Sequence, residues 1–340
     1  VQVEAELRAR TFGQDFRVKT YSCMMIERGY HSLFFPGGTR ARSGMVERRL
    51  KLGLAGTGVE AFARNQARGI SRPVFFVPTT LNYALVLEAE TLIEDHLKGA
   101  GKSRYIIDDD ESTQGGRVLD FFTKLRQLRS AMVVRFGEPL DPFCNPIDDE
   151  GRSIAPSGRT VDPASYVKHH GVATIDAARD AGYTRELGEA IAREMQRETV
   201  IMWTQLVAHV LYRQLVHMTP ELDLFGRQRV RGQIEMPRAQ LEAEVGAARD
   251  KLKEISAAGG VQLGPILRLH SPQEIVEQAL KAWSGYHTTV IASEHGSNIV
   301  IGDPNLLLFY QNRLVPHAEA LATAETAAAA RTIAAMGGAA

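Results

Sequence analysis

The chain has 340 residues, of which 44% are hydrophobic and 24% are charged, with 40 basic and 40 acidic side chains. This length predicts roughly two domains and is ample for a large hydrophobic core. The zero net charge excludes the overall positive field that is typical of nucleic-acid-binding proteins, so we expect no nucleic-acid partner. Two cysteines, Cys23 and Cys144, are too few for a disulfide framework. No run of about 18 uncharged apolar residues occurs, so the sequence predicts no transmembrane helix.

The first elements are a helix and a strand. A helix is expected over 15–28, with Gly29 placed to end it. The apolar residues Leu33, Phe34 and Phe35 then predict a short buried strand.

The turn that follows this strand carries donors for an anion. Its two arginines present planar forks that can bond a phosphate through two parallel N–H groups. Its glycines leave the backbone open to a close approach by a ligand. The residues concerned are Gly37, Gly38, Thr39, Arg40, Arg42 and Ser43. The alternative is a surface turn with two solvated arginines, and the spacing alone does not decide between the two.

Further strands and helices alternate up to residue 140. Helices are expected over 46–68 and 88–97, and buried strands over 74–83 and 131–140. Pro78 marks an edge, a bulge or the exit of its strand into a site. Strands separated by helices predict an α/β domain, a mixed sheet with its faces covered by helices.

A shift in composition marks a domain boundary. Residues 142–165 are rich in Pro, Gly, Ser and Asp, which is typical of a long connection. The sequence beyond it predicts a mainly helical C-terminal domain with a β-hairpin near 288–301. We therefore expect part of an α/β domain over 1–145, a linker over 146–170, a helical domain over 171–317 and a disordered alanine-rich tail over 318–340.

Several helix ends in the C-terminal half have specific signals. Ser271 and Glu274 form a capping box, Asp303 precedes Pro304, and Gly259 follows a helix that opens at Pro237. The apolar stretch 199–218 has two interpretations, a core helix or a helix lying on a bilayer surface.

No catalytic base is recognisable. An acyl-transfer motif places Asp five residues after His, and none of the ten histidines has Asp at that offset. No Gly-x-Ser-x-Gly elbow or phosphate-binding loop occurs. The acidic run 108–111 is interpreted as a solvated loop, and we expect no metal and no cofactor.

The stretch 26–44, which contains the arginine turn, resembles the third conserved block of the glycerol-3-phosphate acyltransferase family, within the glycerolipid acyltransferase superfamily. The stretch 74–83 resembles the fourth block, the strand ending in Pro, and 7–13 resembles the end of the second. The stretch 304–317, which contains Tyr310, Asn312 and Arg313, resembles the family's C-terminal region.

The resemblance implies transfer of a fatty acyl group from acyl-CoA or acyl carrier protein to the hydroxyl of glycerol 3-phosphate, in phospholipid biosynthesis at the cytoplasmic face of a membrane. It implies that Arg40 and Arg42 hold the acceptor phosphate, assisted by Arg10 (or Arg8). Thr39 and Ser43 would add hydroxyl donors, Gly38 would provide the turn, and Gly37 and Pro78 would shape the site.

Two departures accompany the resemblance. The family's His-x-x-x-x-Asp block would lie before Val1, so we expect an N-terminally truncated fragment that is inactive alone. Gly37 also stands where many members have Glu. The alternatives are a lysophosphatidic acid acyltransferase and a non-catalytic module that binds lipid phosphate.

Overall fold

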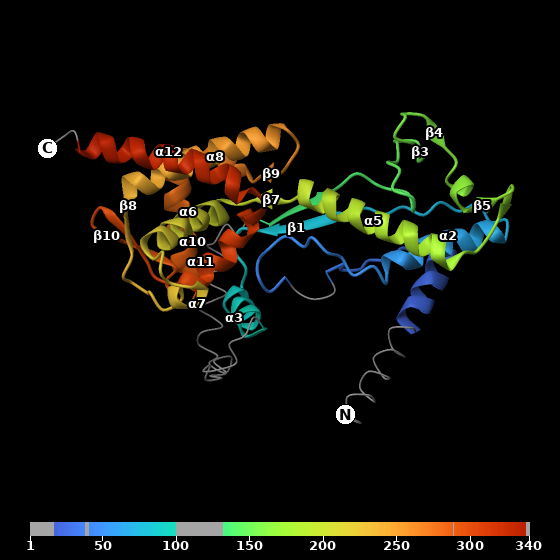
Figure 1. Ribbon diagram of the computed structural model, residues 1–340, viewed down its shortest axis with the longest axis horizontal. Helices are drawn as coiled ribbons and strands as arrows, with labels where there is room; N and C mark the ends of the chain where they lie inside the picture. Colours follow the sequence, from blue (N-terminus) through green and yellow to red (C-terminus); the bar gives the residue numbers. More distant parts are fainter. Residues whose placement is uncertain (1–16, 38–40, 100–131, 288, 338–340) are drawn as a thin grey trace, which may run out of the picture. The chain divides into compact units, whose positions relative to one another are not determined.

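The computed structural model describes residues 17–37, 41–99, 132–287 and 289–337. By Cα packing, the described residues form two compact units, shown with their elements in Figure 1. Unit 1 is drawn from Val1–Arg40, Glu47–Thr80 and Phe136–Glu198, and unit 2 from Ala41–Val46, Leu81–Arg135 and Thr199–Ala340. The predicted domains are each continuous in sequence, whereas each unit combines three separate segments of the chain. The predicted domain boundaries therefore stay a prediction.

Unit 1 is built around two helices. Helical residues 17–27 end where Gly29 takes a left-handed φ of 88°, as the sequence predicted. Helix α2 (Ala55–Ala67) packs against α5 (Ala177–Arg197). The segment expected to be a linker contributes small elements here: β3 (Ser153–Ile154), β4 (Thr160–Val161), η2 (Pro163–Val167), β5 (Lys168–His169) and β6 (Val172–Ala173).

Unit 2 is mainly helical. Its helices are α3 (Ala89–Gly99), α6 (Trp203–Met218), α7 (Leu224–Arg227), α8 (Arg238–Ala257), α9 (Pro265–Leu269), α10 (Pro272–Tyr286), α11 (Pro304–Gln311), η3 (Asn312–His317) and α12 (Ala318–Gly337). In place of the predicted disorder, the alanine-rich tail forms α12, which packs along α8 (Figure 1).

Helix α6 settles one question left open by the sequence. Its residues from Trp203 to Leu211 are all buried, and they belong to one large apolar cluster with α8, α10 and α11. A helix buried on every side is a core helix. Among the described residues, no helix has the length and apolarity needed to cross a membrane.

The sheets are small. Strand β1 (Thr79–Tyr83) pairs with β2 (Met132–Phe136), and β7 (Val200–Ile201) pairs in parallel with β9 (Gln262–Leu263). The predicted hairpin is present as β10 (Ala292–His295) and β11 (Asn298–Ile301), joined by β8 (Glu235–Pro237). The protein is therefore a mixed α/β structure, and the described part contains sheets of two or three strands only.

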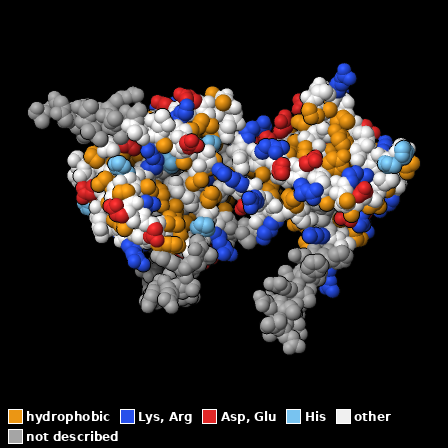
Figure 2. Space-filling view, in the orientation of Figure 1, with side chains coloured by type: hydrophobic (Ala, Val, Ile, Leu, Met, Phe, Trp, Pro, Cys, Tyr) orange, Lys and Arg blue, Asp and Glu red, His pale blue; other side chains and the backbone are white. Residues whose placement is uncertain are grey.

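Figure 2 shows basic and acidic side chains interspersed on the face in view, as the zero net charge suggests. Cys23 and Cys144 are both free thiols, in agreement with the cysteine count.

Candidate functional site: an arginine turn and a basic pocket

The predicted site residues are only partly within the described structure. Arg10, Gly38, Thr39 and Arg40 lie outside the described residues, as does the acidic run 108–111. Gly37, Pro78, Arg42 and Ser43 are described. Gly37 is half-buried, and its neighbour Pro36 accepts a hydrogen bond from the Lys51 backbone N–H at 2.7 Å.

The strand predicted before the turn is absent. Residues 30–35 form no ladder, and the side chains of Leu33 and Phe35 are 86% and 72% exposed. The prediction was wrong because an apolar run becomes a buried strand only when a neighbouring strand pairs with it, and that partner is not encoded locally.

The second half of the turn is fixed to the C-terminal part of unit 2. The Asn312 side-chain amide on η3 donates to the Ser43 carbonyl at 2.8 Å. Gly44, with φ of 75°, fits closely against α11, because a Cβ there would lie 2.1 Å from the Phe309 carbonyl oxygen. The backbone of the turn is therefore anchored, while the Arg42 side chain is exposed and forms no ion pair with described residues.

Arg313 follows Asn312 and carries a charge that the described residues do not neutralise. Its Nη2 donates to Asn82 Oδ1 at 3.1 Å, and its Nε is buried without a hydrogen-bond partner. Burial lowers the pKa of Arg313 to about 10, so the guanidinium stays charged at neutral pH. The Asn312–Ser43 hydrogen bond thus joins the segments that carry Arg42 and Arg313. Only the resemblance had singled out Arg313.

Pro78 lies at the beginning of β1 and not at its end, which corrects the predicted strand. Phe76 exchanges backbone hydrogen bonds with Leu140, and the Pro78 carbonyl accepts from Gly137 N–H at 2.7 Å. The missing N–H of proline falls in this irregular stretch of the ladder, where it disrupts no regular pairing.

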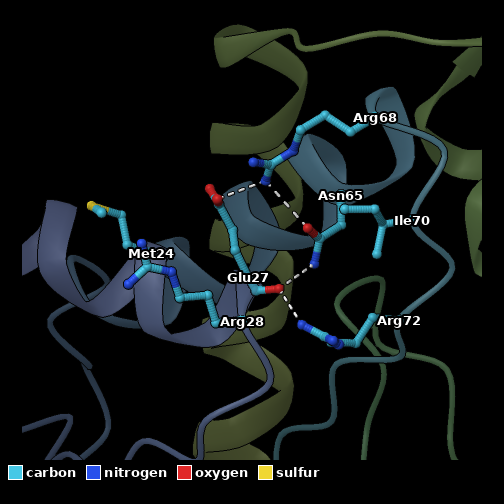
Figure 3. A pocket seen from close by; sticks show the side chains of 7 residues that line it. All are labelled: Met24, Glu27, Arg28, Asn65, Arg68, Ile70 and Arg72. Carbon is cyan, nitrogen blue, oxygen red and sulfur yellow. Dashed lines mark hydrogen bonds and ion pairs between the residues drawn. The ribbon is translucent and has the colours of Figure 1, made fainter.

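A basic pocket lies at the C-terminal ends of helix 17–27 and α2, both in unit 1 (Figure 3). This cavity of about 430 Å³ is lined by three arginines and one acidic side chain, among other residues. We call it the Glu27 pocket, and its lining residues are Met24, Glu27, Arg28, Asn65, Arg68, Ile70 and Arg72.

Glu27 organises this pocket through two groups. Its carboxylate accepts from Arg68 Nη2 at 2.6 Å, and its carbonyl, at the end of the helix, accepts from Asn65 Nδ2 at 3.1 Å and from Arg72 Nη1. Partial burial alone would raise the pKa of Glu27, but the hydrogen bond from Arg68 and nearby charges outweigh it and lower the pKa. Glu27 is therefore held ionised.

Two histidines in unit 2 are buried and were not singled out from the sequence. Burial lowers the pKa of His209 and of His287 to about 4. His287 Nε2 lies 2.8 Å from the Tyr310 hydroxyl, which accepts from Val86 N–H at 3.1 Å. These contacts join α10 and α11 to the chain before α3. Within the described ranges, no cluster of His, Cys, Asp and Glu could hold a metal ion.

Comparison with known proteins gives partial matches. No family model matches the chain. A protein of Histophilus somni named glycerol-3-phosphate acyltransferase is 34% identical over 122 residues, which are 36% of this chain and 13% of the relative. A protein of Actinobacillus succinogenes with the same name is 28% identical over 207 residues, 57% of this chain and 24% of the relative. The matches thus cover between 13% and 24% of the length of these curated relatives.

Proposed function

Since the chain belongs to the glycerol-3-phosphate acyltransferase family, we propose that it forms the acceptor-binding part of an enzyme that transfers a fatty acyl group from a thioester to glycerol 3-phosphate. The thioester is that of coenzyme A or of acyl carrier protein. Because the product is a phospholipid precursor, we place the enzyme at the cytoplasmic face of a membrane.

The acceptor phosphate is assigned to the arginine turn. Arg40 and Arg42 bond it, with Thr39 and Ser43 as hydroxyl donors and Arg10 assisting. The observation that carries this assignment is the anchored backbone of the turn, because the Ser43 carbonyl accepts a hydrogen bond from Asn312 while the exposed Arg42 side chain forms no ion pair with the described residues. An arginine on a fixed backbone loses less entropy when it binds a ligand. Arg313 follows Asn312, the residue that anchors the turn, and adds a positive charge to that segment.

The transfer step needs a base that these residues do not supply. The acceptor hydroxyl attacks the thioester carbonyl carbon, the hydroxyl proton passes to the base, the C–S bond breaks and the thiolate leaves with that proton. We assign the base to a His-x-x-x-x-Asp motif in another part of the enzyme, since no histidine of this sequence has that spacing. Binding the phosphate beside such a base makes acyl transfer effectively unimolecular.

The test is steady-state kinetics of the full-length enzyme with glycerol 3-phosphate and, separately, with lysophosphatidic acid. Arg40→Ala should weaken transition-state binding of the acceptor by about 2 kcal/mol, roughly thirtyfold in kcat/KM, with little change in the KM of the acyl donor. Arg49→Ala is the matched control, because Arg49 is exposed in the same part of the sequence. An unchanged acceptor KM and kcat in Arg40→Ala would overturn the phosphate assignment. Lysophosphatidic acid as the only acceptor would overturn the choice of substrate.

A further inference from the structure

The Glu27 pocket has more positive charge than its own contacts neutralise. Three arginines line it against a single carboxylate, a formal balance of 3 − 1 = +2. Arg68 pairs with Glu27, and Arg72 donates to the Glu27 carbonyl, which is neutral. Arg28 forms no side-chain hydrogen bond or ion pair in the part of the chain that the structure describes. We propose that the Glu27 pocket is a second anion site, which binds a phosphate group.

Two of the three arginines of the pocket, Arg68 and Arg72, are held in place. Gly29, at a left-handed φ of 88°, leaves room for Arg72, since a Cβ there would lie 3.3 Å from the Arg72 guanidinium. Arg68 is fixed by Glu27 and by Asn65 Oδ1 at 3.2 Å, and Asn65 is itself buried. In Figure 3, Arg68 and Arg72 approach Glu27 while Arg28 extends beside Met24. Fixed guanidinium groups with unused N–H donors suit a phosphate better than a flexible cluster does.

This pocket is separate from the start of the arginine turn. The Pro36 carbonyl accepts a hydrogen bond from the backbone N–H of Lys51, which lies four residues before the start of α2. Asn65 and Arg68, which line the pocket, lie at the other end of that helix. Helix α2 has 13 residues, so its ends are roughly 20 Å apart. One phosphate group cannot contact both ends. The pocket and the start of the arginine turn are therefore distinct features of unit 1, and the test of the pocket, which changes Arg28, is separate from the kinetic test of Arg40.

The ligand chemistry is a phosphate group, free or as an ester. Neutral ligands gain nothing from the unbalanced charge, and a phosphate offers several acceptor oxygens to arginine forks. Such a group could come from a soluble phosphate compound or from a phospholipid headgroup. The exposed apolar residues Met24 and Ile70 also line the pocket and could contact an apolar part of either molecule.

The test measures binding to the purified chain at low ionic strength, where screening is weak. The probes are inorganic pyrophosphate, by calorimetry, and phosphatidylcholine vesicles with and without phosphatidic acid, by co-sedimentation. Arg28→Glu should weaken binding about tenfold. Arg159→Glu, which makes the same change of charge at an exposed position of unit 1, should leave it unchanged.

Each outcome has one meaning. Binding of pyrophosphate that is lost in Arg28→Glu alone supports a site for soluble phosphate compounds. Binding only to vesicles with phosphatidic acid, lost in the same variant, supports the site and names a lipid headgroup as the source. Absence of binding to either probe, or equal losses in both variants, would overturn the proposal. Near-ultraviolet circular dichroism of the tyrosines in unit 1 checks that Arg28→Glu is folded.

Discussion

The two units are stabilised in different ways. Unit 2 has one continuous apolar core that spans α3, α6, α8, α10 and α11. Unit 1 has two small clusters, Val59, Leu140, Leu187, Ala190 and Ile191 in one, and Phe62, Ala63, Phe143 and Val167 in the other. A unit with little apolar burial depends more on hydrogen bonds and ring contacts. The Glu27 pocket lies in this polar unit, and the anchored half of the arginine turn lies on the apolar one.

Polar contacts compensate for the small cores in unit 1. The buried carboxylate of Asp141 accepts from the backbone N–H groups of Phe143 and Asn145, at 2.8 and 2.9 Å, and from Asn145 Nδ2 at 2.8 Å. Phe143 then stacks on Tyr166 with ring centroids 4.7 Å apart and meets Tyr183 edge-on. One buried aspartate therefore shapes the loop that positions the aromatic cluster.

The largest expected effect lies in the core of unit 2. Leu206→Ala removes a fully buried side chain from α6 and should cost about 4 kcal/mol of the free energy of unfolding of unit 2. Both tryptophans, Trp203 and Trp283, are buried in unit 2, so tryptophan fluorescence during denaturation with urea reports this unit. Leu269→Ala is the matched control, since Leu269 is 79% exposed, and it should have almost no effect. Equal effects of the two would contradict a continuous core.

A pH effect should also distinguish the units. His287 has a folded pKa of about 4 against about 6.5 when unfolded, so the unfolded state binds more protons between these values. The stability that His287 contributes is complete above pH 6.5 and is lost as the pH falls towards 4, by up to about 3 kcal/mol. Buried His209 should add a loss of the same sign.

Tryptophan fluorescence at several pH values measures this effect. His287→Gln should flatten the pH dependence of the stability of unit 2, whereas His295→Gln, on the exposed hairpin turn, should leave it as in the wild type. A pH dependence that is the same in all three proteins would show that His287 does not titrate as the structure indicates.

A smaller effect is expected in unit 1. Asp141→Ala leaves two buried backbone N–H groups without their acceptor and should cost about 2 kcal/mol in this unit. The near-ultraviolet signal of Tyr166 and Tyr183 should be lost at lower urea concentration, with no change in tryptophan fluorescence. Asp149→Ala, at an exposed neighbour, serves as the control. A shift in the tryptophan signal would show that the units do not unfold separately.

Elements with local signals could be predicted from the sequence. The capping box of Ser271 and Glu274, the cap at Asp303 and the left-handed Gly259 are present as expected, because each acts within one helical turn. The conformation of residues 33–35 could not be predicted from the sequence. An apolar run forms a strand only when another strand pairs with it, and the structure assigns no strand to these residues.

The candidate site was predictable only where its residues adjoin in sequence. The arginine turn is a continuous motif, and its resemblance to a family could be seen directly. The hydrogen bond that anchors the turn could not be predicted, because Asn312 and Ser43 are 269 positions apart in the sequence. The Glu27 pocket likewise depends on Asn65 and Arg72, which are 38 and 45 positions from Glu27.

The most direct test of the central claim is the binding of glycerol 3-phosphate to this chain, compared with glycerol, by isothermal titration calorimetry. With Arg28→Glu present in every protein to weaken the second anion site, we predict that glycerol 3-phosphate binds, that glycerol does not, and that Arg42→Ala abolishes most of the binding, while Arg49→Ala retains it. Binding of glycerol as strong as that of its phosphate, or binding unchanged in Arg42→Ala, would contradict the assignment of the arginine turn to the acceptor phosphate.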